Sequence, residues 1–319
     1  MLTTYSIAEL LDLRPPAWLI DGVIPVQGLT AIYGRPGGGK SFIALDMALS
    51  VAAGAPWQGH PTQKGCVVYI SAEGGGGLGK RVGAWLAHHQ IKPYQYPDLF
   101  ANFIVAAIQV HPESEDLAGI IEQTVNHPTY RHKLVEDSLE CNQDPNQADD
   151  PPLFIIVDTL ARCLQGDENQ QEDMGNFIKG LDILRIEHDA TALVVHHTNK
   201  EGFDERGSSS FRGACDTMMF ASKEEGEVTL KCTKQKDYEE FTEEIFELVL
   251  IPEWESCVVQ ATYQRLNHER ELIAEFLSEK PDTPIRDIAE ALGMSKSSVH
   301  RRVLEIRKGE KGSLGQDLN

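Results

Sequence analysis

The chain has 319 residues, of which 41% are hydrophobic, and its formal net charge is −20 at pH 7. Such acidity argues against a protein whose whole surface is basic and binds nucleic acid. No segment contains the roughly 18 consecutive apolar residues that a membrane-spanning helix needs, so we expect no membrane partner. The first residues lack the basic and then apolar pattern of a secretory signal. Six scattered cysteines, without a C-x-x-C pair, favour reduced thiols in a cytoplasmic protein over disulfides or a zinc site.

The charge is unevenly distributed along the chain. Residues 264–319 contain ten basic and ten acidic side chains, whereas residues 1–263 contain 19 basic and 39 acidic ones and therefore carry the whole net charge. Within the tail, residues 295–311 contain six basic and two acidic side chains. We therefore predict two domains, 1–263 and 264–319, and expect any contact with duplex DNA in the second.

An apolar run over residues 29–33 is followed by a glycine-rich segment and then by an apolar helical segment, 41–53. This order of strand, loop and helix is the context that the phosphate-binding motif G-x-x-x-x-G-K-S/T requires. The glycines let backbone N–H groups surround an anion, and the helix N-terminus adds partial positive charge. We predict that this segment binds ATP, with Lys40 on the β- and γ-phosphates and Ser41 on Mg²⁺. The predicted nucleotide-binding residues of this segment are Gly34, Arg35, Pro36, Gly37, Gly38, Gly39, Lys40, Ser41 and Phe42.

Acidic residues follow two further apolar runs. Cys66–Ser71 leads into Ala72 and Glu73, and the run 153–157 is closed by Asp158. Continuous apolar runs of this length are typical of parallel strands buried on both faces, and ligands bind at the carboxyl ends of such strands. Glu73 is placed to polarise the water that attacks the γ-phosphate, and a solvated glutamate at a strand end is the alternative. Asp158 matches the second Mg²⁺-linked carboxylate of P-loop NTPases.

A further apolar run, 192–195, ends in His196 and His197. We expect both imidazoles at the same edge of the sheet, where they can hydrogen-bond to the γ-phosphate. A metal-binding histidine pair is the alternative, but adjacent strand residues point to opposite faces, which argues against chelation.

Other segments are expected to complete the core. Strands are predicted at Phe103–Ala107, 228–233, 246–250 and 258–262, and we assign no chemistry to the acidic insertion 126–152. A helix is predicted over residues 174–188. Its expected inner side consists of Phe177, Ile178, Leu181, Ile183, Leu184 and Ile186.

Basic side chains occur late in the first domain. The glycine- and serine-rich loop 201–212 contains Arg206 and Arg212 and suits contact with nucleic acid or a neighbouring subunit. Lys234 and Lys236 fall on one face of an extended strand, where a solvated charge cluster is an equally good interpretation.

Residues 285–304 have the pattern of a helix, a turn and a second helix. Ala289 is small where two helices cross, Gly293 permits a tight turn, and Val299 is apolar where the second helix packs. The alternative to a DNA-binding module is an ordinary three-helix packing module. The basic bias favours DNA, and the side chains expected to face a major groove are Lys296, Ser298, His300, Arg301 and Arg302.

The order of these motifs resembles the RecA-like ATPases of the RepA hexameric helicase type, over roughly residues 15–262. The segments that carry the resemblance are the phosphate loop, Ala72-Glu73, Asp158, Gly166-Asp167-Glu168-Asn169, His196-His197 and Arg206-Gly207-Ser208-Ser209. The resemblance implies an α/β fold, a RecA-like P-loop NTPase core with a mainly parallel sheet. A small all-α helix-turn-helix domain, with or without a wing, would follow this core.

The resemblance also implies roles for residues of the site. Glu73 corresponds to the catalytic carboxylate and Asp158 to the Walker B aspartate. His197, together with His196, matches the position that senses the γ-phosphate.

Four basic residues would act on the nucleotide of a neighbouring subunit. Arg206 resembles the arginine finger, and Arg212 competes for that role because it lies in the same loop. Lys234 and Lys236 resemble the basic pair that acts in trans in related ring ATPases. A ring-shaped homo-oligomer follows from this resemblance, with six subunits and single-stranded DNA in its pore.

These features predict an ATP-hydrolysing DNA motor, a RepA-like replicative DNA helicase that uses ATP and Mg²⁺. Two alternatives stay open. One is a non-helicase ATPase of the same fold in recombination or signalling, and the other is an ATP-switched initiator or regulator that binds a DNA site. The acidic insertion and the helix-turn-helix domain depart from the resemblance.

Overall fold

The computed structural model describes residues 6–7, 17–72, 77–92, 99, 102–107, 152–164, 166–199, 205–262, 272–278, 280–281, 283–294, 296, 299–300 and 302–303. The chain divides into two compact units, Met1–Val259 and Gln260–Asn319, and each is described by itself.

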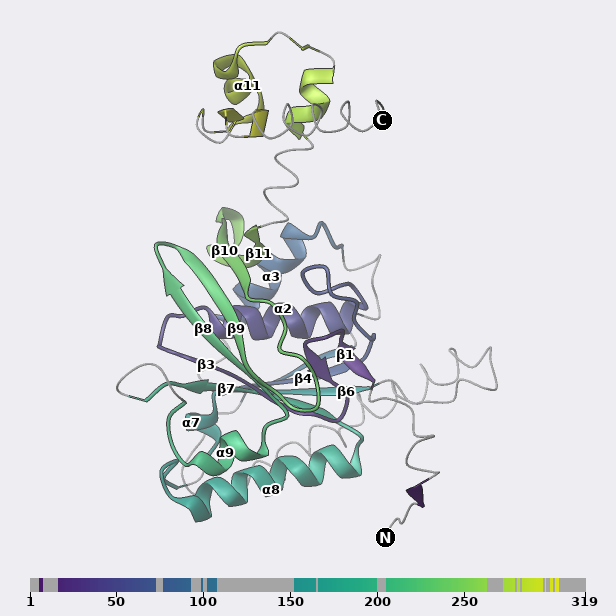
Figure 1. Cartoon of the computed structure of the whole chain (residues 1–319), viewed down its shortest axis with the longest axis vertical. Coiled ribbons are helices and arrows are strands. Elements are labelled where there is room, and N and C mark those ends of the chain that lie inside the picture. Colours follow the sequence, from purple (N-terminus) through teal and green to yellow (C-terminus); the bar gives the residue numbers. More distant parts are fainter. Residues whose placement is uncertain are drawn as a thin grey trace, which may run out of the picture. The chain divides into compact units, whose positions relative to one another are not determined.

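A large, mainly parallel sheet organises the first unit (Figure 1). The strands are β1 (Trp18–Ile20), β2 (Ile24–Pro25), β3 (Leu29–Gly34), β4 (Cys66–Ser71), β5 (Phe103–Ala107), β6 (Leu153–Asp158), β7 (Thr191–His197), β8 (Thr217–Glu224), β9 (Glu227–Gln235), β10 (Glu244–Ile251) and β11 (Ser256–Ala261). Within the described residues, nine of them form one sheet in the order β11-β10-β9-β8-β3-β7-β6-β4-β5, and β1 pairs with β2. The strands from β8 to β5 run parallel, and β9 and β10 extend the sheet antiparallel.

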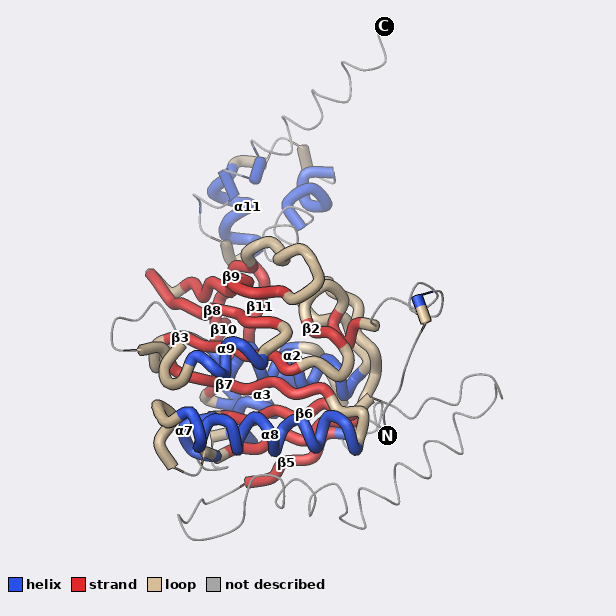
Figure 2. Tube along the Cα trace, turned by 60° about the horizontal axis from the view of Figure 1, so that its bottom comes forward, coloured by secondary structure: helices blue, strands red, loops and turns tan. Residues whose placement is uncertain are grey.

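Burial explains why the central strands are continuous apolar runs. Every residue of β3, β4 and β6 is buried, because helices cover both faces of the parallel part. The helices α2 (Lys40–Ala53) and α3 (Leu78–His88) lie on one face, and α7 (Leu160–Cys163), α8 (Gln171–Glu187) and α9 (Ser209–Ala214) on the other (Figures 1 and 2). The predicted α/β class with a mainly parallel sheet is therefore confirmed.

Two expectations about the core were incomplete or wrong. Sequence patterning did not predict β8, whose first three residues are all buried and show no alternation. In α8, Ile183 and Ile186 were expected inside, but they are 40% and 79% exposed. They are three residues apart and share the outer side of the helix, whereas the inner side consists of Met174, Phe177, Ile178, Leu181 and Leu184.

The described part of the second unit contains α11 (Ile285–Leu292), which ends at Gly293 with φ 65°. A small core buries Ile273, Ile288, Ala289, Val299 and Val303. The predicted packing of Ala289 and Val299 is thus confirmed, and Gly293, where a tight turn was predicted, has a left-handed backbone. Among the described residues of the whole chain, no helix is long and apolar enough to cross a membrane.

Candidate nucleotide-binding site

The glycine-rich loop connects the carboxyl end of β3 to the first turn of α2. Gly37 and Gly39 have φ values of 77° and 84°, a conformation that residues with a Cβ rarely adopt. Gly34 is required for a different reason, because a Cβ there would lie 2.0 Å from the carbonyl oxygen of Ala221 in β8. The loop therefore depends on glycine for its backbone conformation and for its fit against β8.

Lys40, the first residue of α2, folds its side chain back across the loop. Its Nζ donates hydrogen bonds to the carbonyl oxygens of Gly34, at 3.0 Å, and Arg35, at 2.9 Å. The residue is only 5% exposed, so the ammonium lies inside the loop that the sequence assigns to phosphates. Arg35 and Pro36 are exposed at the outer side of this loop, and Phe42 is half-buried in α2.

Ser41 and Asp158 meet between α2 and β6. The Ser41 Oγ donates a hydrogen bond to Asp158 Oδ1 at 3.1 Å, although the two residues are 117 positions apart. A hydroxyl and a carboxylate are the oxygen ligands that a P-loop NTPase offers to Mg²⁺, which takes its remaining ligands from phosphates and water. The donor set therefore fits the predicted metal. Glu73 lies outside the described residues.

Asp158 has a second partner that sequence reasoning missed. The Oη of Tyr69, in β4, donates a hydrogen bond to Asp158 Oδ2 at 2.7 Å, and Tyr69 is fully buried. The position of Tyr69 in its strand could have predicted this contact. Side chains alternate along a strand, and this alternation places Tyr69 on the same face of the sheet as Asp158.

The two histidines at the end of β7 point to different surroundings, in agreement with the expected alternation. His196 is fully buried, its ring contacts Phe211 of α9, and its Nε2 donates to the carbonyl oxygen of Arg206 at 2.6 Å. Burial is the main cause that lowers the pKa of His196, so this imidazole is neutral at pH 7. His197 is partly exposed, and its carbonyl oxygen accepts the Arg206 N–H at 2.9 Å.

Arg206 is held within its own chain by a residue that sequence reasoning assigned no role. Its guanidinium forms an ion pair with Glu168, which is only 5% exposed. The backbones also meet, because Ser208 N–H donates to the Glu168 carbonyl oxygen at 2.9 Å. The segment around Arg206 is thus joined to both the loop before α8 and the end of β7.

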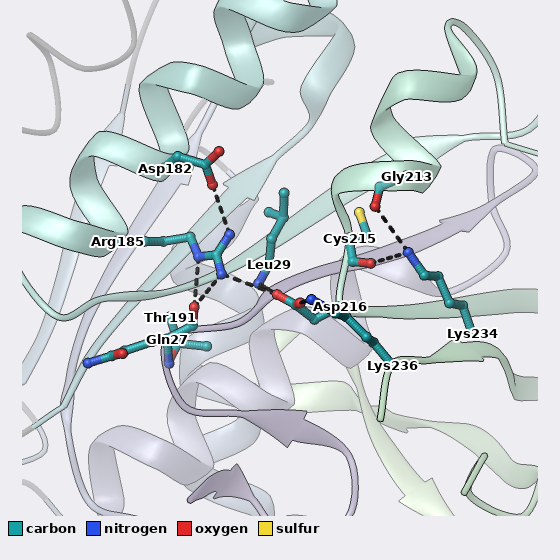
Figure 3. Close-up of polar contacts among 10 residues, drawn as sticks. All are labelled: Gln27, Leu29, Asp182, Arg185, Thr191, Gly213, Cys215, Asp216, Lys234 and Lys236. Carbon is teal, nitrogen blue, oxygen red and sulfur yellow. Dashed lines mark hydrogen bonds and ion pairs between the residues drawn. The ribbon is translucent and has the colours of Figure 1, made fainter. Parts of the chain in front are cut away.

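Arg212 and Lys234 are held by groups around α9. Arg212 pairs with Glu205 at 2.9 Å and donates to the Thr233 carbonyl oxygen at 3.3 Å. Lys234 Nζ donates to the Arg212 carbonyl oxygen at 2.7 Å. It also donates to the carbonyl oxygens of Gly213, at 3.3 Å, and Cys215, at the carboxyl end of α9 (Figure 3). It thereby satisfies carbonyl groups that lack partners within the helix.

Lys236 contacts a different group close by. Its Nζ lies 3.7 Å from Asp216 Oδ1, and Arg185 of α8 pairs with the same carboxylate at 3.1 Å (Figure 3). Asp216 also accepts the N–H of Leu29, the first residue of β3. Lys236 therefore lies at the amino end of β3, whereas the phosphate loop follows the carboxyl end of that strand.

A buried carboxylate lies behind the phosphate loop. Asp46 of α2 is 3% exposed and accepts hydrogen bonds from Gln58 Nε2 and Trp85 Nε1, both at 2.7 Å. Burial raises the pKa of Asp46 to about 6, and these neutral donors oppose that effect only in part. This acid connects the helix that carries Lys40 and Ser41 to α3.

The residues expected to contact DNA do not all face solvent. Lys296 and His300 are exposed, and Ser298 and Arg301 lie outside the described residues. Arg302 was expected on the outer side of the second helix but is only 6% exposed. It follows Val299 by three positions and precedes Val303, so it shares their buried side.

The α/β fold, the glycine-rich loop and the Ser41–Asp158 pair define a P-loop nucleotide-binding core. Residues 7–202 match the family model described as "AAA domain", and the chain belongs to that family. Residues 270–305 match the model described as "Winged helix-turn-helix DNA-binding", so the predicted tail domain is confirmed as winged helix-turn-helix.

A solved structure, "Crystal structure of the RadB recombinase", is similar to this chain at 15% sequence identity and a TM-score of 0.47. The similarity covers 74% of this chain and 91% of that chain. No curated protein matches this chain.

Proposed function

We propose that this chain is an ATP-hydrolysing DNA motor that works as a ring-shaped homo-oligomer, of the RepA-like replicative helicase type. The observation that carries the ATPase part is the contact between Ser41 Oγ and Asp158 Oδ1 beside Lys40, at the end of the phosphate loop. It brings a metal-binding hydroxyl, a carboxylate and a buried ammonium into one site from segments that are far apart in sequence.

The residues of the site have separate roles in this proposal. Ser41 and Asp158 would hold Mg²⁺, which neutralises charge on the β- and γ-phosphates when it is bound. Lys40 would exchange its two carbonyl acceptors for phosphate oxygens, which bind an ammonium more strongly than neutral acceptors do. Glu73 would orient and deprotonate the attacking water, and His197 would hydrogen-bond to the γ-phosphate.

The proposed oligomer would bring the late basic residues to the nucleotide of a neighbouring subunit. The ammonium of Lys236 contacts Asp216 beside the first residue of β3, at the opposite end of that strand from the phosphate loop. A role for it in hydrolysis therefore requires the nucleotide of another subunit. Arg206 and Arg212 are the candidate fingers, and such a residue raises hydrolysis by roughly 10³- to 10⁵-fold in analogous enzymes.

The DNA part is supported by the winged helix-turn-helix match and by the exposed Lys296 and His300. These side chains would contact duplex DNA, and single-stranded DNA would pass through the pore of the ring. Basic side chains add affinity mainly through phosphate contacts, so binding should weaken as salt increases.

Steady-state ATP hydrolysis, with and without single-stranded DNA, tests this proposal. We expect DNA to stimulate turnover, Lys40→Ala and Glu73→Gln to lower it by about 10²-fold or more, and dilution below the dissociation point of the oligomer to lower the rate per subunit. A forked duplex then tests unwinding directly. Turnover that is indifferent to DNA would instead support a non-helicase ATPase, and tight sequence-dependent duplex binding with little turnover would support an ATP-switched initiator or regulator.

A further inference from the structure

Tyr69 and Asp158 share one face of the sheet. The residues of β4 and β6 that pack in the core on the α8 side are Cys66, Val68, Ile70, Leu153, Ile155 and Val157. Because side chains alternate along a strand, Tyr69 and Asp158 project to the other face, which α2 covers. Tyr69 is paired with Ile156 in the parallel register, so Asp158 is its diagonal neighbour on that face.

Two hydroxyl groups hold the two oxygens of the same carboxylate. Ser41 Oγ donates to Asp158 Oδ1 at 3.1 Å, and Tyr69 Oη donates to Oδ2 at 2.7 Å. The carboxylate torsion of an aspartate has broad, weakly defined minima, so a group held at one oxygen alone can rotate. Donors on both oxygens fix its plane, and the donor on Oδ2 comes from β4, a strand in which every residue is buried.

We propose that Tyr69 is a positioning residue for Mg²⁺: its hydroxyl holds Oδ2 of Asp158 so that Oδ1 faces Ser41 and the metal. This inference rests on the magnesium site of the proposed function. Tyr69 would act only through Asp158 and would touch neither the nucleotide nor the metal.

Because Tyr69 is buried, a substitution can remove its hydroxyl group and keep the packing of its ring. The side chain is fully buried, and its ring centroid lies 6.2 Å from that of Phe103, so a phenylalanine would fill the same space. Tyr69→Phe therefore removes the hydrogen bond to the charged Asp158 and little packing. If the hydroxyl serves folding alone, this change lowers thermal stability and leaves the effect of the metal on nucleotide binding as it was.

The experiment measures the affinity of the full chain for a fluorescent ADP analogue in excess Mg²⁺ and again in EDTA. The Kd in EDTA divided by the Kd in Mg²⁺ reports how strongly the metal supports binding, whether or not ATP is hydrolysed. We expect Tyr69→Phe to reduce this ratio about 3- to 10-fold, while the Kd in EDTA stays within about 2-fold of the wild type.

Tyr33→Phe is the matched control. Tyr33 is also a buried tyrosine, 2% exposed, and its hydroxyl donates to Thr233 Oγ1 at 3.1 Å, on the α8 side of the sheet. We expect this variant to keep the wild-type ratio. In an Asp158→Asn background, Tyr69→Phe should cause no further fall in the ratio, because the carboxylate on which it acts is gone.

The outcomes separate this proposal from the one on which it rests. A wild-type ratio in Tyr69→Phe, or an equal fall in Tyr33→Phe, would overturn the role of Tyr69 alone. A wild-type chain that binds the analogue equally well in Mg²⁺ and EDTA would overturn the magnesium site and this role together. If Tyr69→Phe does not fold, wild-type protein labelled with 3-fluorotyrosine provides a second measurement. Its Tyr69 ¹⁹F resonance should shift when Mg²⁺ is added to the ADP-bound chain, and an unmoved resonance would overturn the proposal.

Discussion

The two ends of β3 hold charged groups in opposite ways. At the amino end, the carboxylate of Asp216 accepts the N–H of Leu29 and pairs with both Arg185 and Lys236 (Figure 3). At the carboxyl end, the ammonium of Lys40 is held by neutral carbonyl oxygens of the glycine-rich loop.

The two carboxylates Asp46, behind the phosphate loop, and Asp216, at the amino end of β3, differ in the same way in the charge of their partners. Asp46 is buried among neutral donors, Gln58 and Trp85, and its pKa is raised to about 6, whereas Asp216 has two cationic partners. Charges at the amino end are therefore neutralised within the chain and stabilise it. Near the phosphate loop, Asp46 accepts from neutral donors and Lys40 donates to neutral carbonyl oxygens, so Lys40 gains charged acceptors when a polyphosphate arrives.

Removing Lys40 is expected to have the largest effect. Lys40→Ala should lower kcat/KM for ATP by about 10²- to 10³-fold, the range seen when one donor to a transition-state charge is lost. The free energy of unfolding should change by less than about 1 kcal/mol, because the carbonyl oxygens of Gly34 and Arg35 that accept from Lys40 are neutral. Steady-state kinetics and urea unfolding measure the two effects, and a large loss of stability with retained activity would contradict the comparison.

Neutralising Asp46 should change how stability depends on pH. Because burial raises its pKa from 3.8 to about 6, the folded chain holds this proton more tightly than the unfolded chain does. Wild-type stability is therefore lost as pH rises through that interval. The stability of Asp46→Asn relative to the wild type should accordingly increase by about 2–3 kcal/mol between pH 4 and pH 7.

Urea unfolding across this pH range measures the difference. A difference between Asp46→Asn and the wild type that does not vary with pH would mean that Asp46 is not the group responsible.

Arg185→Ala tests the amino end of β3. Arg185 donates to the Gln27 carbonyl oxygen at 2.8 Å and pairs with Asp182 and Asp216. Its loss should lower the free energy of unfolding by roughly 1.5–3 kcal/mol and leave ATP turnover per folded molecule unchanged. Arg185→Lys should recover only part of the stability, because an ammonium lacks the guanidinium fork. If Arg185→Ala lowers ATP turnover as much as Lys40→Ala does, the amino end of β3 serves turnover as well as stability, and the comparison between the two ends of β3 is wrong.

Lys236→Ala should have the smallest effect on stability. The side chain is 61% exposed and lies 3.7 Å from Asp216, so its loss should cost less than about 1 kcal/mol. If Lys236 acts on a neighbouring nucleotide, turnover per subunit should nevertheless fall at concentrations where the oligomer forms. Comparison of the rates above and below the dissociation point measures this, and equal rates for variant and wild type at both would exclude the role in trans.

Local patterns predicted much of the central fold. The runs that became β3, β4 and β6 were recognisable because strands buried on both faces must be apolar throughout. Patterning failed at two places. β8 was missed because only its first part is apolar and its last residues, Lys223 and Glu224, are exposed, so it forms neither a continuous apolar run nor an alternating one. Ile183 and Ile186 were placed inside because hydrophobicity alone does not say which apolar residues of a helix face the core.

By itself, the sequence determined the phosphate loop with Lys40 and Ser41, because that chemistry depends on contiguous residues between a strand and a helix. Strand-end position was enough to select Asp158 as well. Only the tertiary structure brought Tyr69 to Asp158, across 89 positions, and Arg206 to Glu168. Such contacts depend on strand order, register and loop packing. The spacing of residues along the chain does not predict which residues the fold will bring together.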